Sequence, residues 1–321
     1  MATSASKKQE ISSCLQPASS ALLSFQCFPN EDAARLYFEK RRWGSTLPTC
    51  GHCGSIDIRE CKDHKPMPYR CRSCRKHFSV RTGTVLAESR LPLQKWLLAI
   101  YMLTSARKGI PSTQMARELG ITQKSAWFLA QRIRETWLKD RDGNMGNHTQ
   151  VDETYLGGKE RNKHASKKLR AGRGAVGKTA VVGIRDETGE VRARPVANTK
   201  AKTLKSFIRE HVSIGSTVIT DDFSAYHGLG AEGFTHKTVR HSVGQFVRDM
   251  AHTNGIESFW ALLKRGYYGI YHFMSAKHLH RYVKEFSFRH NTANLGTMPF
   301  IDMTIDQITG KRLTYERLIN A

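Results

Sequence analysis

The chain has 321 residues, of which 51 are Lys or Arg and 28 are Asp or Glu, so its formal net charge is +23. This length accommodates two or three domains with buried cores, and the ordinary aliphatic and aromatic content excludes a globally disordered chain. No apolar run approaches the ~20 residues that cross a bilayer, so we do not expect a membrane-spanning protein. No amphipathic basic helix or lipidation signal is found, so we expect no membrane partner either. A secretory signal is not expected either, because Ser, Gln and Pro interrupt the apolar residues of 11–28.

The positive charge is spread over the whole chain. Residues 1–150 hold 24 Lys and Arg against 12 Asp and Glu, a surplus of 12, and residues 151–321 hold 27 against 16, a surplus of 11. A basic tail on a neutral protein is therefore excluded. Such a surplus favours a polyanionic partner, because every phosphate that is neutralised releases condensed counterions. We therefore expect nucleic acid as the partner.

The first segments of the chain are predicted to be an arm and a short helix. Residues 1–24 are rich in Ser, Ala and Gln, which predicts a flexible arm. Apolar side chains then recur at helical spacing between Glu31 and Trp43, after a residue, Asn30, that is a suitable N-cap. We expect a small packing helix there.

Two Cys-x-x-Cys pairs lie 17 residues apart in the region 25–85. They carry four thiols: Cys50, Cys53, Cys71 and Cys74. A two-residue gap lets both thiolates of a pair reach one ion, and four thiolates complete a tetrahedral zinc shell. The pattern predicts a zinc ribbon with a structural Zn²⁺, because a closed shell leaves no position for a substrate. A redox pair is the alternative, but no βαβ pattern accompanies it.

The remaining cysteines fit a reducing compartment. Cys14, Cys27 and Cys61 are an odd number, which does not suit a framework of disulfides. We interpret Cys61 and the nearby His52 as residues that do not bind the zinc. A cytoplasmic protein is therefore expected.

A helix-turn-helix domain is predicted for residues 90–140. One apolar helix covers Leu93–Leu103, and a second begins at Ser112 and ends at the turn residue Gly120. The apolar seam of the pair consists of Ala116, Leu119, Ile121, Ala126 and Leu129. The third helix would present Gln123, Lys124 and Ser125 to DNA at its first turn. On this motif alone a purely structural helical hairpin is an alternative, and the basic balance favours DNA. Residues 140–147 are expected to be a linker.

From Thr149 onward strands dominate, with acidic residues in two of them. The predicted strands are 150–156, 179–185, 191–196 and 216–221, with a helix at 203–211 between the last two. Acidic pairs occur in two of the runs, at Asp152-Glu153 and at Asp221-Asp222. Because neighbours on a strand point to opposite faces, only one acid of each pair can face a common site.

A third acid is predicted on a helix. Apolar residues recur at helical spacing in 254–264, and Glu257 and Lys264 are seven residues apart, so both project from nearly the same side. Two strand aspartates and one helix glutamate suit two Mg²⁺ ions, since carboxylate oxygens are hard ligands. Two ions ~3.5–4 Å apart can serve an in-line phosphoryl transfer.

This arrangement resembles the catalytic domain of DDE transposases. The features that match are two aspartates, 35 residues between Asp221 and Glu257, and a Lys seven residues further on. Asp-Glu-Thr-Tyr-x-Gly-Gly-Lys at 152–159 and Asn-Gly-Ile-Glu-Ser-Phe-Trp at 254–260 are similar to one branch of bacterial insertion sequences. The resemblance covers about residues 25–292. It implies Asp152 and Asp221 as the strand acids, and Asn254 as an alternate third position, because relatives in this branch are thought to use Asn there.

The resemblance further implies a fold and a reaction. The fold is a ribonuclease-H-like α/β catalytic domain at residues 148–292, preceded by the zinc ribbon and the helix-turn-helix domain, with 293–321 as a C-terminal tail. The reaction is 3′-end cleavage of a mobile element and strand transfer into target DNA, with Mg²⁺ or Mn²⁺ held by Asp152, Asp221 and Glu257. Lys264 would contact a phosphate. The resemblance also implies a homodimer or higher oligomer on double-stranded DNA, in the cytoplasm of a bacterium and associated with its nucleoid.

Basic residues near these acids are predicted to contact the DNA backbone. They are Lys163, Lys167, Lys168, Arg170 and Arg173 in the loop 159–178, and Arg265 on the glutamate helix. The same loop contains a GxxxxGK[ST] match at 172–179. The match is followed by a β-rich run instead of the helix that would hold a phosphate, so we interpret it as chance. His252 and His272 are interpreted as structural residues.

Three alternatives remain open from the sequence. The first is a DNA-binding regulator with a zinc ribbon, a helix-turn-helix and an inert nuclease-like domain. The second is an ATP-driven enzyme that uses residues 172–179. The third is a ribonuclease or resolvase with the same fold.

Overall fold

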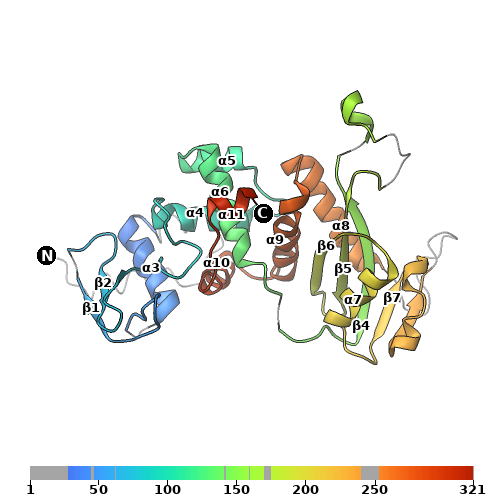
Figure 1. The fold of residues 1–321 in the computed structure, drawn as a ribbon, viewed down its shortest axis with the longest axis horizontal. Helices are drawn as coiled ribbons and strands as arrows, with labels where there is room; N and C mark the ends of the chain where they lie inside the picture. Colours follow the sequence, from blue (N-terminus) through green and yellow to red (C-terminus); the bar gives the residue numbers. More distant parts are fainter. Residues whose placement is uncertain are drawn as a thin grey trace. The chain divides into compact units, whose positions relative to one another are not determined.

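The computed structural model describes residues 28–44, 47–61, 63–140, 142–158, 160–169, 175–239 and 253–320. The chain divides into two compact units, which are described separately (Figure 1). Unit 1 consists of Met1–Trp137 and Asn294–Ala321, and unit 2 of Leu138–Ala293. The predicted arm 1–24 and the residues Arg170, Arg173 and His252 lie outside the described residues. In the part that is described, no helix has the length and apolar character needed to span a membrane.

Unit 1 begins with the predicted helix and the zinc ribbon. Helix α3 (Glu31–Trp43) starts after Asn30, whose Oδ1 accepts the N–H of Ala33 at 2.9 Å, as predicted for an N-cap. A three-stranded antiparallel sheet of order β1-β2-β3 follows. Its strands are β1 (Ile58–Glu60), β2 (Tyr69–Cys71) and β3 (His77–Phe78). The zinc-ribbon fold expected from the cysteine spacing is therefore confirmed.

Three helices follow the ribbon in unit 1. They are α4 (Leu93–Ser105), α5 (Ser112–Leu119) and α6 (Gln123–Thr136). Gly120 ends α5 with a φ of +58°, a left-handed conformation that strains any side chain, and its N–H bonds to the carbonyls of Ala116 and Arg117. Thr122 then caps α6 by accepting the N–H of Ser125 at 3.2 Å. The predicted helix, glycine turn and second helix are all present.

The C-terminal segment is helical, and the expectation of a tail at 293–321 missed it. It contains α10 (Thr297–Asp306) and α11 (Tyr315–Asn320). Helix α10 packs within unit 1: Arg41 pairs with Asp306 at 2.5 Å, and the Trp137 indole donates to Thr304 at 3.2 Å. After α10 the segment contacts the residues that follow the zinc ribbon, since the N–H of Val85 donates to the carbonyl of Ile308 at 3.0 Å.

Unit 2 contains a five-stranded mixed sheet of order β6-β5-β4-β7-β8 (Figure 1). The strands are β4 (His148–Leu156), β5 (Thr179–Asp186), β6 (Val191–Val196), β7 (Thr217–Thr220) and β8 (Thr235–Thr238). The first three are antiparallel neighbours, whereas β7 runs parallel to β4, and β8 parallel to β7. Helix α7 (Ala201–His211) makes the crossover from β6 to β7. This is the expected ribonuclease-H-like arrangement, and β8 was not predicted.

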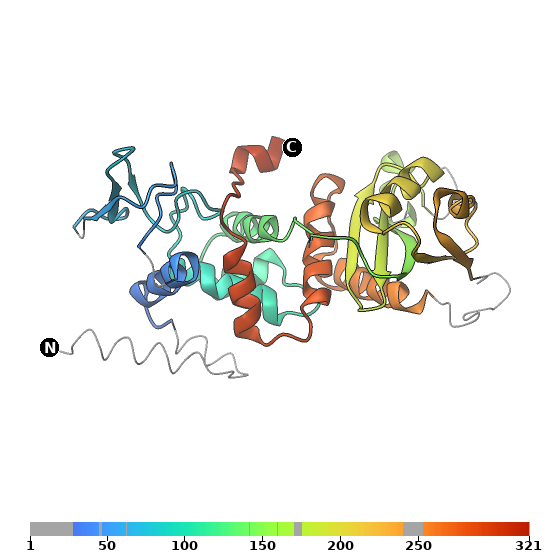
Figure 2. The same cartoon turned by 90° about the horizontal axis from the view of Figure 1, so that it is seen from below.

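The two faces of this sheet carry separate cores. Helix α7 covers one face, where its apolar side pairs with Val151, Val182, Ile184 and Val218. Helices α8 (Asn254–Gly266) and α9 (Leu279–Asn291) cover the other face. There they pack against side chains of the sheet, which are Leu156, Val181, Val191 and Ala193. Figure 2 shows the orange and red helices of residues 254–291 against the sheet. Along β4, odd-numbered side chains therefore face α7 and even-numbered ones face α8.

Candidate active site and metal centre

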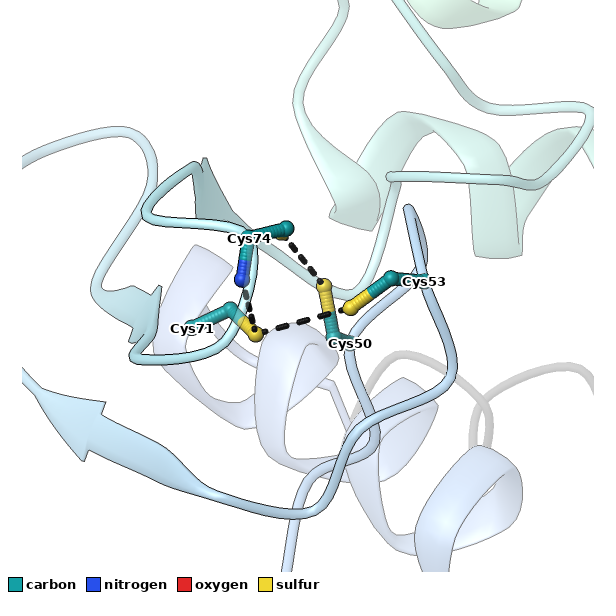
Figure 3. A group of neighbouring side chains, drawn as sticks. All are labelled: Cys50, Cys53, Cys71 and Cys74. Carbon is teal, nitrogen blue, oxygen red and sulfur yellow. Dashed lines mark hydrogen bonds between the residues drawn. The ribbon is translucent and has the colours of Figure 1, made fainter.

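Four thiols of the zinc ribbon gather at one point (Figure 3). Cys50 and Cys53 belong to the loop before β1, Cys71 ends β2, and Cys74 lies in the turn to β3. The Sγ atoms of Cys50 and Cys74 are 3.7 Å apart, those of Cys53 and Cys71 are 3.6 Å apart, and all four lie within 4.8 Å of one another. A tetrahedral shell with Zn–S bonds of about 2.3 Å places its sulfurs roughly 3.8 Å apart. The four thiols therefore fit a zinc ion.

Backbone N–H groups support these sulfurs. The N–H of Cys74 lies 3.5 Å from the Sγ of Cys71, and the N–H of His52 lies 3.4 Å from the Sγ of Cys50. The first of these bonds, with help from the neighbouring thiols, lowers the pKa of Cys71 to about 6. The His52 ring has its Nε2 3.3 Å from the carbonyl of His77, and neither His52 nor Cys61 joins the four thiols.

Asp152 occupies the α8-facing side of β4. The indole Nε1 of Trp260 donates to its Oδ2 at 3.0 Å, and the N–H of Glu153 donates to its Oδ1 at 2.8 Å. Helix α8 comes this close because Gly183 is the partner of Asp152 on β5. A Cβ at Gly183 would lie 2.6 Å from the Cη2 atom of Trp260. The indole thus occupies the space that glycine leaves. It holds one oxygen of Asp152, and the backbone N–H of Glu153 holds the other.

Asp221 lies next to Asp152 at the end of the neighbouring strand. Ile219 is paired with Gln150 in the parallel register of β7 and β4, and two further residues along both strands bring Asp221 level with Asp152. Its Oδ1 accepts the N–H of Phe223 at 3.1 Å. Burial raises the pKa of Asp152 to about 7, with further contributions from the charges of Glu153 and Asp221. Carboxylates crowded in this way repel one another, and this donor set fits a hard divalent cation.

Glu153 points to the opposite face of the sheet. Its Oε2 accepts the hydroxyl of Tyr226 at 2.6 Å, and Tyr226 is fully buried on the α7 side. The alternation expected along β4 therefore separates Glu153 from Asp152. Burial raises the pKa of Glu153 as well. Tyr226 was not among the predicted site residues, although it lies only five residues after Asp221 in the sequence.

Glu257 lies on α8, one turn before Trp260, and its side chain is exposed. Its Oε1 accepts the hydroxyl of Thr253 at 2.6 Å. Within the described ranges, the four cysteines are the only group of three or more ligand residues whose donor atoms gather closely enough to hold an ion. The structure thus brings Asp152 and Asp221 together, and it places Glu257 on the adjoining helix without closing the set of three carboxylates.

Lys264 and Asn254 are also exposed on α8. At about 100° per residue, Lys264 lies roughly 20° from Glu257 around the helix axis. Both side chains therefore lie near the side of the helix on which Trp260 contacts Asp152. Asn254 is the first residue of the helix, about 60° from Glu257.

The predicted DNA-contacting residues are mostly exposed, and several have intramolecular partners. Gln123 donates to Ser112 at 2.8 Å, and the Lys124 ammonium lies 4.6 Å above the ring of Tyr315 in α11. In the loop after β4, Lys163 pairs with Glu160 at 2.5 Å. Lys167, Lys168 and Arg265 are exposed, and Ser125 is half-buried, where its hydroxyl accepts that of Thr122.

The GxxxxGK[ST] match lacks the element that a phosphate site requires. Lys178 is followed directly by β5, so no helix begins there. The described part of the match therefore agrees with its interpretation as chance.

Comparison with known proteins gives two family matches. Residues 144–291 match the ISXO2-like transposase domain, and residues 29–77 match the transposase zinc-ribbon domain. A relative described as an uncharacterized protein in transposable element ISH50 of Halobacterium salinarum is 26% identical over 255 residues, which are 76% of this chain and 85% of the relative. Because this relative is archaeal, the expected bacterial origin is not confirmed.

Two solved structures align over most of the chain with little likeness. They are the Mos1 transposase paired-end complex with left transposon end, at 10% identity, and a pre-cleavage Mos1 transpososome, at 11%. The alignments cover 94% and 96% of this chain and 98% and 99% of the other chains, each with a TM-score of 0.23. No conclusion rests on a likeness of that size.

Proposed function

We propose that this chain, in which a transposase zinc-ribbon domain precedes an ISXO2-like transposase domain of the DDE type, is a DNA transposase that cuts the 3′ ends of its element and joins them to target DNA. The observation that carries the proposal is the position of Asp152. It is half-buried on β4, beside Asp221 at the end of the adjacent strand, and Trp260 ties it to the helix of Glu257. A carboxylate held in this way, in a domain of this family, is suited to phosphoryl transfer on DNA.

The chain's own residues have distinct tasks in this proposal. Asp152, Asp221 and Glu257 would hold divalent cations, with Mg²⁺ or Mn²⁺ as the suitable ions. Such ions, when bound, activate the attacking oxygen and stabilise the leaving oxygen. Trp260 and the N–H of Glu153 keep the two oxygens of Asp152 in fixed directions, so little reorganisation is needed when substrate arrives. Lys264 would neutralise a phosphate near the scissile bond as a point charge.

Two successive displacements make up the proposed reaction. In the first, a water oxygen bonds to phosphorus at the element end, and the bond to the 3′ oxygen breaks, which leaves a 3′-hydroxyl. In the second, that hydroxyl attacks a phosphorus of the target, and the target's own 3′ oxygen leaves and takes up a proton. Both steps are in-line phosphoryl transfers, so the same carboxylates can serve both.

Unit 1 and the basic loop would bind the DNA. The first turn of α6, with Gln123, Lys124 and Ser125, projects from unit 1, as expected of a helix that reads base edges. Lys167, Lys168 and Arg265 would contact the backbone near the catalytic residues. Because two element ends have to be cut and joined together, we propose that the protein works as a dimer or higher oligomer.

The test is cleavage of an end-containing duplex in the presence of Mg²⁺ or Mn²⁺. The inverted repeats that flank the reading frame would supply the substrate. Wild-type protein is expected to nick at the 3′ ends and to form joined products, and Asp221→Asn is expected to lose both activities by at least about a hundredfold. Asp222→Asn is the matched control, since it removes the adjacent acid. Equal loss in both variants, or metal-independent cleavage, would contradict the proposed role of Asp221.

A DNA-binding regulator is the second candidate function. It is favoured by one observation: Glu257 is exposed and bonded to Thr253, and it does not gather with the two aspartates. A regulator would bind the same element ends and show no metal-dependent cleavage or joining under any condition. Cleavage that depends on Asp152 and Asp221 but is indifferent to Glu257→Gln would assign the third position to another residue, with Asn254 as the first to test.

A further inference from the structure

The segment that follows Glu257 combines basic and aromatic residues and lacks acids. Between Glu257 and Glu285 there are 27 residues with no Asp or Glu, and they include five Lys or Arg and seven aromatic residues. Three basic side chains of this segment, Lys264, Arg265 and Lys277, are exposed, and so is the imidazole of His272. Basic residues interleaved with aromatic ones are typical of surfaces that bind single-stranded nucleic acid.

Two tyrosines of this segment anchor a turn in unit 2. After α8 the chain makes a π-helical turn, Tyr267–Tyr271, which ends at His272 with a φ of +56°. Tyr267 is buried in the core, and the Tyr271 hydroxyl donates to Glu285 at 2.9 Å, with its ring 4.9 Å from that of Tyr282. These contacts fix the turn on α9. Such turns interrupt helices frequently at functional sites.

Two other aromatic side chains, one in this turn and one just after it, project into solvent. Tyr268 is 43% exposed, and Phe273 is 71% exposed. The Tyr268 hydroxyl donates to the carbonyl of Gly157, just after β4, at 3.4 Å. This bond holds the hydroxyl end of the half-exposed ring. Leaving Phe273 in water forfeits the free energy of its burial, so packing gives no reason for a phenylalanine here. The anchored turn therefore presents two aromatic rings on a rigid base.

The rings continue the line of the proposed catalytic residues. Glu257 and Lys264 lie along one edge of α8, and Tyr268 follows in the π-helical turn that begins directly after this helix. Tyr268 is four residues after Lys264, so a strand whose phosphate contacts Lys264 can bring a nearby base to the Tyr268 ring.

We propose that Tyr268 and Phe273 form a stacking platform for unpaired bases of the DNA strand that is cut at Asp152 and Asp221. The inference rests on the proposed transposase function and adds binding residues to it. Stacking requires an exposed base face, which a paired and stacked duplex does not offer, and the surrounding positive charge holds the strand's phosphates. A second copy of this chain fits less well, because it would bring the like charges of this segment together.

The test compares single strands with duplexes on the full-length protein. Fluorescence anisotropy with a labelled oligodeoxythymidine of about 12 nucleotides, and with a duplex of the same length, measures both affinities without added Mg²⁺, so binding is separated from cleavage. The variants are Phe273→Leu, Tyr268→Leu and, as the conservative change, Phe273→Trp. The control is Ile214→Ala, since Ile214 is an equally exposed apolar residue of unit 2 at 80%.

We expect each leucine variant to weaken single-strand binding about five- to hundredfold, as loss of one base–aromatic stack does, while duplex affinity changes less than about threefold. Phe273→Trp should keep wild-type affinity, and Ile214→Ala should not differ from wild type. Unchanged single-strand affinity in both leucine variants would overturn the proposal. So would a loss of dimer or higher oligomer in sedimentation with equal effects on both DNAs, because the rings would then belong to a protein interface.

Failure of the inference can be told apart from failure of the function. If wild-type protein cleaves element ends and both leucine variants bind single strands normally, only the stacking platform is wrong. If wild-type protein never cleaves, but the leucine variants still lose single-strand binding, the platform stands and the proposed reaction is wrong.

Discussion

Asp152→Asn is expected to make the protein more stable above neutral pH while it abolishes cleavage. Burial and two neighbouring acids raise the pKa of Asp152 to about 7 in the folded protein, whereas an unfolded aspartate has a pKa of about 3.9. Between these pH values the folded state keeps a proton that the unfolded state has lost. The contribution of Asp152 to the stability of the wild type therefore falls as pH rises from about 4 to 7, and this loss is complete above the folded pKa.

The size of this effect follows from the shift. About three pKa units at ~1.36 kcal/mol each give an upper bound of roughly 4 kcal/mol. Asparagine does not titrate, so it escapes this penalty. It can, however, accept only one of the two bonds from Trp260 and the Glu153 N–H with its single oxygen, and the lost bond costs about 1 kcal/mol. We expect the variant to be about 1–3 kcal/mol more stable than wild type at pH 8, and slightly less stable at pH 4.

Urea unfolding of both proteins at pH 4, 6 and 8, with zinc retained and no Mg²⁺, measures the difference. Asp222→Asn is measured beside them as the control for the loss of a neighbouring carboxylate. Added Mg²⁺ should stabilise the wild type more than Asp152→Asn, since an ion that binds only the folded state adds to its stability. A stability difference between wild type and Asp152→Asn that is the same at all three pH values would refute the reasoning, because it would show that Asp152 does not carry the raised pKa.

Three further changes test other contacts. Gly183→Ala should destabilise unit 2 by about 1–3 kcal/mol and reduce cleavage, because its Cβ would lie 2.6 Å from the Trp260 ring; normal unfolding midpoints and activity would contradict this. Cys71→Ser should release zinc to a chromogenic chelator and lower the melting temperature of unit 1, whereas Cys61→Ser should do neither. Tyr315→Leu removes a cation–π contact worth about 0.5–1 kcal/mol from Lys124 and should raise duplex affinity about two- to fivefold, while Tyr315→Phe keeps the ring and should leave affinity unchanged.

Local pattern was sufficient for most elements of the fold. The 3.6-residue period indicates α3 and α6, and Asn30 marks the start of α3. The two-residue period of β4 sends Asp152 and Glu153 to opposite faces. The four cysteines could be assigned because ligand spacing is itself a local property. The roles of the individual site residues stay predictions.

Contacts between distant segments could not be predicted in the same way. The strand β8 has only four residues and depends on pairing with β7, and the indole bond from Trp260 to Asp152 joins residues 108 apart in sequence. Lys124 was predicted from its place on a helix, but its partner Tyr315 lies in a segment for which no function was expected. The spacing of apolar residues in the sequence predicts which way a side chain points from its own helix or strand. It does not indicate which other helix or strand packs against that side chain.

The C-terminal segment changes what counts as a domain in this chain. Residues 294–321 belong to the same compact unit as residues 1–137, so unit 2 is inserted between two parts of unit 1. The returning helix α10 contributes Ile301 and Ile305 to the buried interior, and its Thr304 accepts the indole of Trp137, the last residue before the insertion. A fragment that ends after α6 would expose that interior and leave the Trp137 N–H without its acceptor. Because both connections of unit 2 emerge from one packed unit, its boundaries are set by packing at 137 and 294, and not by the linker composition at 140–147.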